Sequence, residues 1–123
     1  MTQKPRDIHD RAFNFACDVI DFCDSVRDLR ATTRHLIWQL FKAATSIGSN
    51  LEEASTGQSK ADFIAKAAIA LKEARESYFW LRVISNKRPA LVEAATPLLR
   101  EANGLVSVLT VILRNARSNP GRG

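Results

Sequence analysis

Few residues of this 123-residue chain carry the side chains that catalysis or metal binding requires. Its two histidines are His9 and His35. Neither follows a glutamate by three positions, the spacing that di-metal carboxylate sites in helical bundles use. Its two cysteines, Cys17 and Cys23, have no histidine at a defined spacing that could activate a thiolate nucleophile. No glycine-rich phosphate loop follows a strand pattern. We therefore expect no catalytic site, no metal and no cofactor.

Four carboxylates on two neighbouring stretches of the chain form the remaining group that could exchange protons. They are Glu52, Glu53, Glu73 and Glu76, with the basic residues Lys72, Arg75 and Arg82 close by in sequence. Lys72 lies four residues before Glu76, which is the spacing of an ion pair on one helical face. Acid–base chemistry is one interpretation of this group. We favour the other, a structural ion-pair network, and expect the chain not to be an enzyme.

The basic residues are more informative, because 18 Lys and Arg outnumber 13 Asp and Glu and give a net charge of +5. A ring of several copies would multiply this charge and attract an anionic partner such as nucleic acid. If sequential helices alternate in direction, basic side chains gather at both ends of a bundle. We expect nucleic acid to contact Arg27, Arg30, Arg34, Lys87 and Arg88 at one end and Arg114, Arg117 and Arg122 at the other.

Amphipathic helices must position these residues. Apolar residues alternate spacings of three and four, which is typical of a helical-bundle seam. The pattern predicts helices over about 7–29, 33–54, 60–85 and 97–117. In the first helix the seam runs from Ile8 to Leu29, and both cysteines are expected to be small buried side chains.

The ends of the predicted helices carry recognisable signals. Thr32 or Thr33 can cap the second helix, and Ser59 followed by Asp62 resembles a capping box. Thr96-Pro97 is typical of a helix start. Because short connections make sequential helices antiparallel, we expect an all-α, up-down-up-down four-helix bundle over residues 7–117. Residues 1–6 are predicted to be a flexible basic arm and residues 118–123 a disordered tail.

Some large apolar residues fall outside the predicted core seams. Trp38 lies on the second helix, and Ile69, Trp80 and Val83 share the outer side of the third, where a monomer would leave them in water. Tryptophan is enriched at interfaces, so we expect these four residues to form a subunit interface. Half-exposed packing on their own helix and stacking on nucleobases are the alternatives for the two tryptophans.

Targeting and membrane signals are weak in this sequence. The N-terminus has no apolar segment typical of a signal peptide. The uncharged run Ala102 to Leu113 is too short to span a bilayer and contains polar residues. We therefore expect a cytoplasmic protein without a membrane partner.

The centre of the chain resembles a known family. The motifs that carry the resemblance are Gln39-Leu40, Ser46-Ile47-Gly48-Ser49-Asn50, Glu52-Glu53-Ala54, Ser59-Lys60-x-Asp62-Phe63, Ala70-Leu71-Lys72-Glu73-Ala74-Arg75-Glu76 and Trp80-Leu81-Arg82. They are similar to motifs of the four-helix-bundle proteins first noticed as reading frames in intervening sequences of bacterial large-subunit ribosomal RNA genes. The match spans roughly Ile8 to Leu113. A more distant resemblance is to the accessory variability protein of diversity-generating retroelements, which partners a reverse transcriptase and binds nucleic acid.

The resemblance implies a fold and an assembly: an antiparallel four-helix bundle in a homopentameric ring without catalytic activity. Arginine is usual in the family where Lys42 stands, and lysine lacks its bidentate geometry. Our first hypothesis is a non-enzymatic homopentameric scaffold that binds RNA or DNA through its basic ends. The second is a protein-interaction adaptor, for example an accessory subunit of a reverse transcriptase, with RNA binding secondary.

Overall fold

The computed structural model describes residues 7–56 and 59–118. The regular structure of this part is helical: α1 (Ile8–Ser25), α2 (Ala31–Ser55), α3 (Lys60–Lys87), the short 3-10 helix η1 (Pro89–Leu91) and α4 (Val92–Arg117). The prediction of an all-α protein with four helices is confirmed. The predicted arm at 1–6 lies outside the described residues, as does the predicted tail after Ser118.

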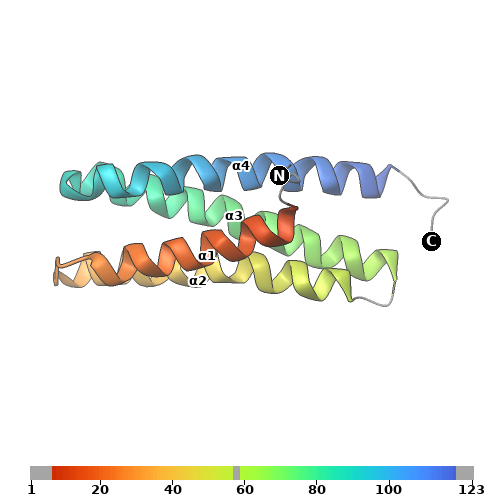
Figure 1. The fold of residues 1–123 in the computed structure, drawn as a ribbon, viewed down its shortest axis with the longest axis horizontal. Helices are drawn as coiled ribbons and strands as arrows, with labels where there is room; N and C mark the ends of the chain where they lie inside the picture. Colours follow the sequence, from red (N-terminus) through yellow and green to blue (C-terminus); the bar gives the residue numbers. More distant parts are fainter. Residues whose placement is uncertain (1–6, 57–58, 119–123) are drawn as a thin grey trace, which may run out of the picture.

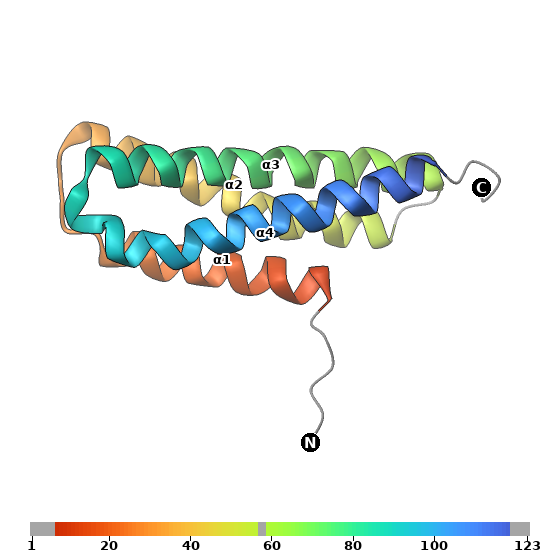
Figure 2. The ribbon, with the colours of Figure 1, turned by 90° about the horizontal axis from the view of Figure 1, so that it is seen from above.

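The four helices lie side by side along one long axis (Figure 1). The sequence colours run from right to left along α1 and α3 and from left to right along α2 and α4. Each helix packs against the next one in sequence, most extensively α2 against α3, and α1 also contacts α4. Because α1 is the shortest of the four, the other three extend beyond it at one end of the molecule (Figure 2).

All four helices contribute to one apolar core. Its buried residues are Ala12, Phe15, Val19, Phe22, Leu40, Ala44, Ile47, Leu51, Ala67, Ala70, Leu71, Ala74, Leu81, Ile84, Ala95, Leu98, Ala102, Leu105, Leu109 and Leu113. These positions keep the three-four spacing that the sequence predicts. Alanine recurs where α3 passes between α2 and α4, and small side chains let neighbouring helices approach closely. The core thus fixes the relative rotation of α3 and α4, which carry most of the site described below.

The first helix ends at Ser25, four residues before the predicted end at Leu29. Val26 has extended backbone (φ −74°, ψ 124°), and Leu29 is 80% exposed rather than part of the core seam. The cause lies in the connection to α2. There the carboxylate of Asp28 accepts the backbone N–H of Arg30 at 3.0 Å, directly before α2 begins. The short polar link therefore interrupts the helical pattern.

The start of α2 also differs from the prediction. Thr32 or Thr33 was expected as the cap, but both lie inside the helix, whose N-cap residue is Arg30. Ser59, in contrast, caps α3 as predicted, because its hydroxyl accepts the backbone N–H of Asp62 at 3.2 Å.

The last helix begins at Val92, five residues before the predicted start at Pro97. The 3-10 helix turns the chain first, with the backbone N–H of Leu91 donating to the Arg88 carbonyl at 2.8 Å. Pro97 therefore lies inside α4, and Thr96 is not its N-cap. The Thr96 hydroxyl instead donates to the Val92 carbonyl at 2.8 Å, within the first turns of the helix.

The two cysteines occupy different surroundings. Cys17 is exposed, so its predicted burial is wrong. Cys23 is half-buried, and its thiol lies 3.9 Å from the Ile37 carbonyl. Burial, with a smaller contribution from the Asp24 carboxylate, raises the pKa of the Cys23 thiol to about 11. Neither environment is typical of a reactive thiolate.

One segment, Pro89–Arg117, is long and apolar enough to cross a membrane by length and composition, with a mean hydropathy of 1.2. Its uncharged part alone, Ala102 to Leu113, is too short to span a bilayer. In the structure, Leu105, Leu109 and Leu113 of this helix are buried in the core, while Glu101 pairs with Arg11 of α1. Core packing therefore accounts for part of this apolar character.

Candidate nucleic-acid interface

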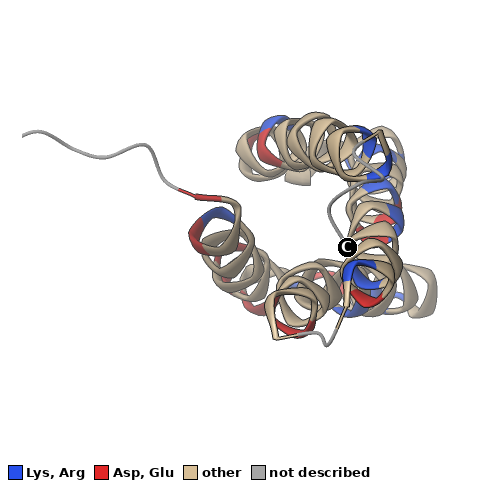
Figure 3. Ribbon diagram, turned by 90° about the vertical axis from the view of Figure 1, so that its right-hand side faces the viewer, with Lys and Arg blue, Asp and Glu red and all other residues tan. Residues whose placement is uncertain are grey.

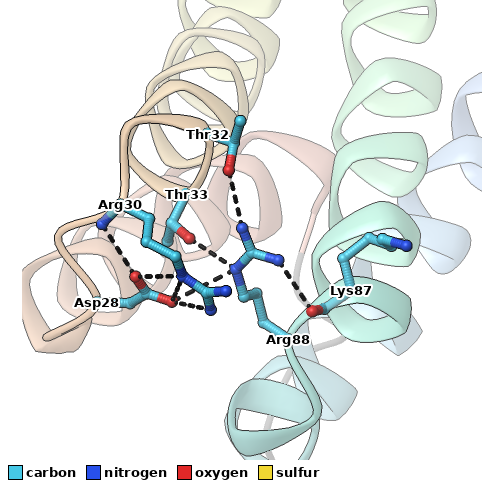
Figure 4. A network of polar contacts seen from close by, with 6 residues as sticks. All are labelled: Asp28, Arg30, Thr32, Thr33, Lys87 and Arg88. Atoms are coloured by element: carbon cyan, nitrogen blue, oxygen red, sulfur yellow. Dashed lines mark hydrogen bonds and ion pairs between the residues drawn. The ribbon is translucent and has the colours of Figure 1, made fainter.

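A polar network joins the α1–α2 connection to the end of α3 (Figure 4). The Arg30 guanidinium donates to both carboxylate oxygens of Asp28, at 3.0 and 3.1 Å from its Nε atom. The Arg88 guanidinium lies 3.3 Å from the same carboxylate and donates to the hydroxyls of Thr33 at 2.6 Å and Thr32 at 2.9 Å. Hydrogen bonds from the Arg30 side chain and backbone hold the pKa of Asp28 well below its usual range.

This network changes the interpretation of two residues predicted to contact nucleic acid. Only 12% of the Arg88 side chain is exposed, and its donors are directed at neighbouring helices. Arg30 is more exposed but shares the Asp28 carboxylate. Their guanidinium groups are held by the protein itself, so both residues have a structural role and are omitted from the interface proposed below.

Arg88 should therefore contribute to stability. In Arg88→Ala, the buried hydroxyl of Thr33 loses the donor that it accepts from and Asp28 loses one of its two cations. We expect the free energy of unfolding to fall by about 1–3 kcal/mol, as urea denaturation would measure. The matched control is Arg34→Ala at an exposed position nearby, which should change it by less than about 0.5 kcal/mol. Equal losses in both variants would contradict the structural role.

Three other residues predicted at this end are exposed but do not converge on one hollow, so they are not part of the interface proposed below. Arg27, Arg34 and Lys87 are exposed, and none of them forms an ion pair with a carboxylate in the described part of the chain. They are dispersed over the α1–α2 connection, α2 and the end of α3. Arg34 borders a cavity of about 340 Å³, beside Leu29 and Trp38.

Arginines converge at the opposite end, between α3 and α4. Arg75, Arg114 and Arg117 line a hollow of about 490 Å³ together with Leu71, Thr110, Leu113 and Ser118. Among the described residues, no aspartate or glutamate lines it. All three guanidinium groups are on exposed residues and form no ion pair within the described ranges. The structure thus brings the predicted Arg114 and Arg117 together, whereas Arg122 lies outside the described residues.

Arg75 is the residue that sequence reasoning missed here, because it was assigned to an ion-pair network. Its position four residues after Leu71, a core residue, was the signal that could have placed it at the edge of the α3–α4 contact. A planar guanidinium donates two parallel hydrogen bonds to phosphate oxygens. Three such groups without an opposing carboxylate form a site suited to a phosphate backbone.

The carboxylates considered for proton transfer instead have basic partners. Glu53 lies 2.8 Å from the Lys66 amine, Glu76 lies 3.9 Å from that of Lys72, and Glu52 lies 3.5 Å from the His9 ring. The predicted pair of Lys72 and Glu76 is thus present, whereas Glu53 pairs with Lys66, which was not among the expected partners. Burial, followed by the charge of Glu76, raises the pKa of Glu73. In the described ranges, no three side chains of the types that ligate metals come together.

The residues predicted for a subunit interface are unequally exposed. Trp38 is 54% exposed, and its ring centroid lies 5.5 Å from that of Phe41. Ile69 is 39% exposed and Val83 is half-buried. Trp80, expected in water, is half-buried against the core, and its indole N–H is buried without a hydrogen-bond partner. Its packing within the monomer therefore corrects that expectation.

These features define a small helical-bundle protein with a cationic hollow on one side. Residues 4–111 match the family described as 23S rRNA-intervening sequence protein, and the chain belongs to that family. The family resemblance drawn from the sequence motifs is thereby confirmed. No curated protein matches this chain.

A solved structure supports the same assignment. The chain is similar to a crystal structure of a protein with unknown function from the S23 ribosomal protein family of Bacteroides thetaiotaomicron. The two share 28% sequence identity and superpose with a TM-score of 0.76, over 87% of this chain and 98% of the other. The likeness covers most of the bundle, and neither comparison indicates a catalytic family.

Proposed function

We propose that this protein is a non-enzymatic, homo-oligomeric helical scaffold that binds nucleic acid through its phosphate backbone. One observation carries the proposal: Arg75, Arg114 and Arg117 converge on a hollow that no carboxylate lines. The net charge of +5 supports it, because each added copy in an assembly strengthens the attraction for a polyanion. Such contacts bind phosphate without reading base sequence.

The proposed assembly is the antiparallel bundle repeated in a pentameric ring, as the family resemblance implies. Large apolar side chains remain exposed on the monomer and support self-association. They are Phe13, Ile20, Leu29, Trp38, Ile69, Phe79, Val92 and Val111. We keep Trp38 and Ile69 as the central interface residues, since both are exposed and apolar, and retain the half-buried Val83 as a further one.

Trp38→Ala tests this interface. Because Trp38 is 54% exposed in the monomer, the substitution should lower the mass of the assembly in light scattering while the helical circular dichroism signal is kept. Trp80→Ala is the contrasting variant, because Trp80 packs against the core and its loss should also lower the melting temperature. Full assembly mass in Trp38→Ala would contradict the interface assignment.

The experiment that tests nucleic-acid binding is a titration of a fluorescently labelled polyribonucleotide followed by anisotropy over a range of salt concentrations. The logarithm of the affinity should fall linearly with the logarithm of the salt concentration. The slope should be near −2 if three phosphates are contacted per subunit, at about −0.7 for each. Duplex and DNA competitors then distinguish the classes of nucleic acid. Undetectable binding at low salt, or binding that ignores salt, would overturn the proposal.

A protein-interaction adaptor is the second candidate, and a specific observation favours it. The 340 Å³ cavity between α1 and α2 is bordered by Leu29, which is 80% exposed, and by Trp38. Exposed apolar groups around a cavity are typical of a protein docking surface. A partner such as a reverse transcriptase would occupy it. A pull-down of that partner that survives nuclease treatment would support this function over direct RNA binding.

A further inference from the structure

A second hollow lies between the same two helices. It measures about 220 Å³ and is lined by Tyr78, Arg82, Leu99, Arg100 and Asn103. The Arg82 guanidinium lies 5.7 Å from the centroid of the Tyr78 ring, within range of a cation–π interaction. Like the larger hollow, which has three arginines, it combines apolar residues with arginines, two in this case, and no aspartate or glutamate is among its described lining residues.

The two hollows follow one another along a single groove. On α3 the lining residues are Leu71 and Arg75, then Tyr78 and Arg82, which alternate spacings of four and three on one helical face. On α4 the order is reversed: residues 110–118 border the first hollow and residues 99–103 the second. This reversal is what two helices running in opposite directions produce, so both hollows lie on the same side of the α3–α4 contact.

We name this feature the arginine groove and define it by Arg75, Arg82, Arg100, Arg114 and Arg117. Its length follows from helix geometry, since Arg100 and Arg117 are 17 positions apart (117 − 100) on α4, which corresponds to about 25 Å at 1.5 Å per residue. One strand of stacked nucleic acid carries a phosphate about every 3.4 Å. The groove is therefore as long as about seven or eight stacked nucleotides.

The acidic residues near the groove are occupied elsewhere. Glu101 of α4 forms a two-fold hydrogen-bonded pair with Arg11 of α1, at 2.8 and 3.0 Å. Glu76 of α3 pairs with Lys72. Figure 3 shows most of the visible Lys and Arg on the right-hand side of the bundle, away from α1, which follows the grey trace at the left. The charged side chains among the described lining residues of the two hollows are all arginines.

We infer that the arginine groove binds one strand of single-stranded nucleic acid along its length, as a track. This inference rests on the proposed function and specifies its ligand. The five arginines, from α3 and α4, line one groove, which matches one phosphate backbone, whereas a duplex presents two strands that diverge around its axis. Bases can stack on the ring of Tyr78 and pack on the apolar lining residues. Every base has a π-face that can make such contacts. Recognition is consequently independent of sequence.

The test uses the double variant Arg82→Gln/Arg100→Gln in the full chain, and the probe is a labelled oligoribonucleotide of about twelve nucleotides, longer than the groove. The variant should weaken binding by at least about tenfold, since charge-assisted hydrogen bonds are lost. The slope of log affinity against log salt should become shallower by about 1.4, or 0.7 for each lost phosphate contact. A trinucleotide, which fills only one hollow, should show a much smaller change.

The matched control is Arg27→Gln/Arg34→Gln, which removes the same charge away from the groove and should leave the salt slope unchanged. A blunt duplex of equal length should compete at least about tenfold more weakly than the single strand. If wild-type protein binds the oligonucleotide but Arg82→Gln/Arg100→Gln behaves as the control does, the track is overturned and the proposed function stands. Equal binding of duplex, or preferred binding of anionic lipid vesicles, also overturns the track. Absence of wild-type binding instead removes the proposed function.

Discussion

The triple variant Arg75→Gln/Arg114→Gln/Arg117→Gln should bind a single-stranded polyribonucleotide about 100- to 1,000-fold more weakly than the wild-type protein at low salt. These three arginines line the larger hollow of the arginine groove, where no carboxylate competes for their donors. Each guanidinium can form charge-assisted hydrogen bonds with phosphate oxygens, and glutamine keeps a donor but loses the charge. Fluorescence anisotropy at several salt concentrations measures both the affinity and the lost slope.

The control must separate this site from the effect of net charge. Arg27→Gln/Arg34→Gln/Lys87→Gln changes the charge equally, from +5 to +2 (5 − 3), but at the opposite end of the molecule. We expect this control to bind within about threefold of wild type, because only long-range attraction is reduced. Equal loss in the two variants would mean that the protein binds polyanions through its overall charge rather than through the groove.

The variant Phe15→Ala should lower the free energy of unfolding by about 3–5 kcal/mol. Phe15 is 1% exposed and packs in the core at the middle of α1. Its removal loses the burial of a large ring and leaves a cavity that long helices cannot easily close. Urea denaturation followed by circular dichroism measures the loss, and the slope of the transition shows whether unfolding stays two-state.

Phe13 provides a control on the same helix with the same substitution. It is 67% exposed, so Phe13→Ala should change stability by less than about 0.5 kcal/mol in the monomer. A loss comparable to that of Phe15→Ala would show that Phe13 is buried by a neighbouring copy of the chain. The pair therefore tests the core assignment and, at high protein concentration, the proposed self-association.

Helix periodicity was sufficient to predict the four helices and most of the core. Residues such as Phe15, Leu40 and Leu105 recur at bundle spacing and are buried as that spacing requires. The failures occur where tertiary contacts override the local pattern. Leu29 continues the apolar seam of α1, but Asp28 binds Arg30 and Arg88 and turns the chain before Leu29 can enter the core.

Helix starts were ambiguous for a related reason. Thr96-Pro97 has the local signature of a beginning, yet the 3-10 helix at Pro89–Leu91 starts the last helix earlier. Proline is also compatible with a position near the start of a longer helix. The sequence alone therefore could not distinguish a helix that starts at Pro97 from one that starts several residues earlier. Similarly, Thr33 has the chemistry of a cap, but its hydroxyl binds Arg88, which is 55 residues away in sequence.

The candidate site was predicted only in part. Alternating helix directions indicate where a residue lies along the bundle axis, but not on which face of the bundle it lies. Arg114 and Arg117 were assigned to an end, whereas Arg75, Arg82 and Arg100 were not recognised as their neighbours. The groove can be identified only when the rotation of α3 and α4 about their own axes is known. The packing of the core residues sets this rotation. Arg88 shows the converse error, since exposure cannot be inferred from charge alone, and Arg30 is exposed but its guanidinium is paired with Asp28.

The packing of each helix on its successor has a consequence for how the chain reaches this structure. Contacts between neighbours in sequence close short loops, and such local topologies fold in microseconds to milliseconds. The α2–α3 pair, which packs most extensively, is the natural nucleus. The contact between α1 and α4, tied by Arg11 and Glu101, joins the most distant segments and should form last. A nascent chain would thus acquire its arginine groove before its two outer helices meet.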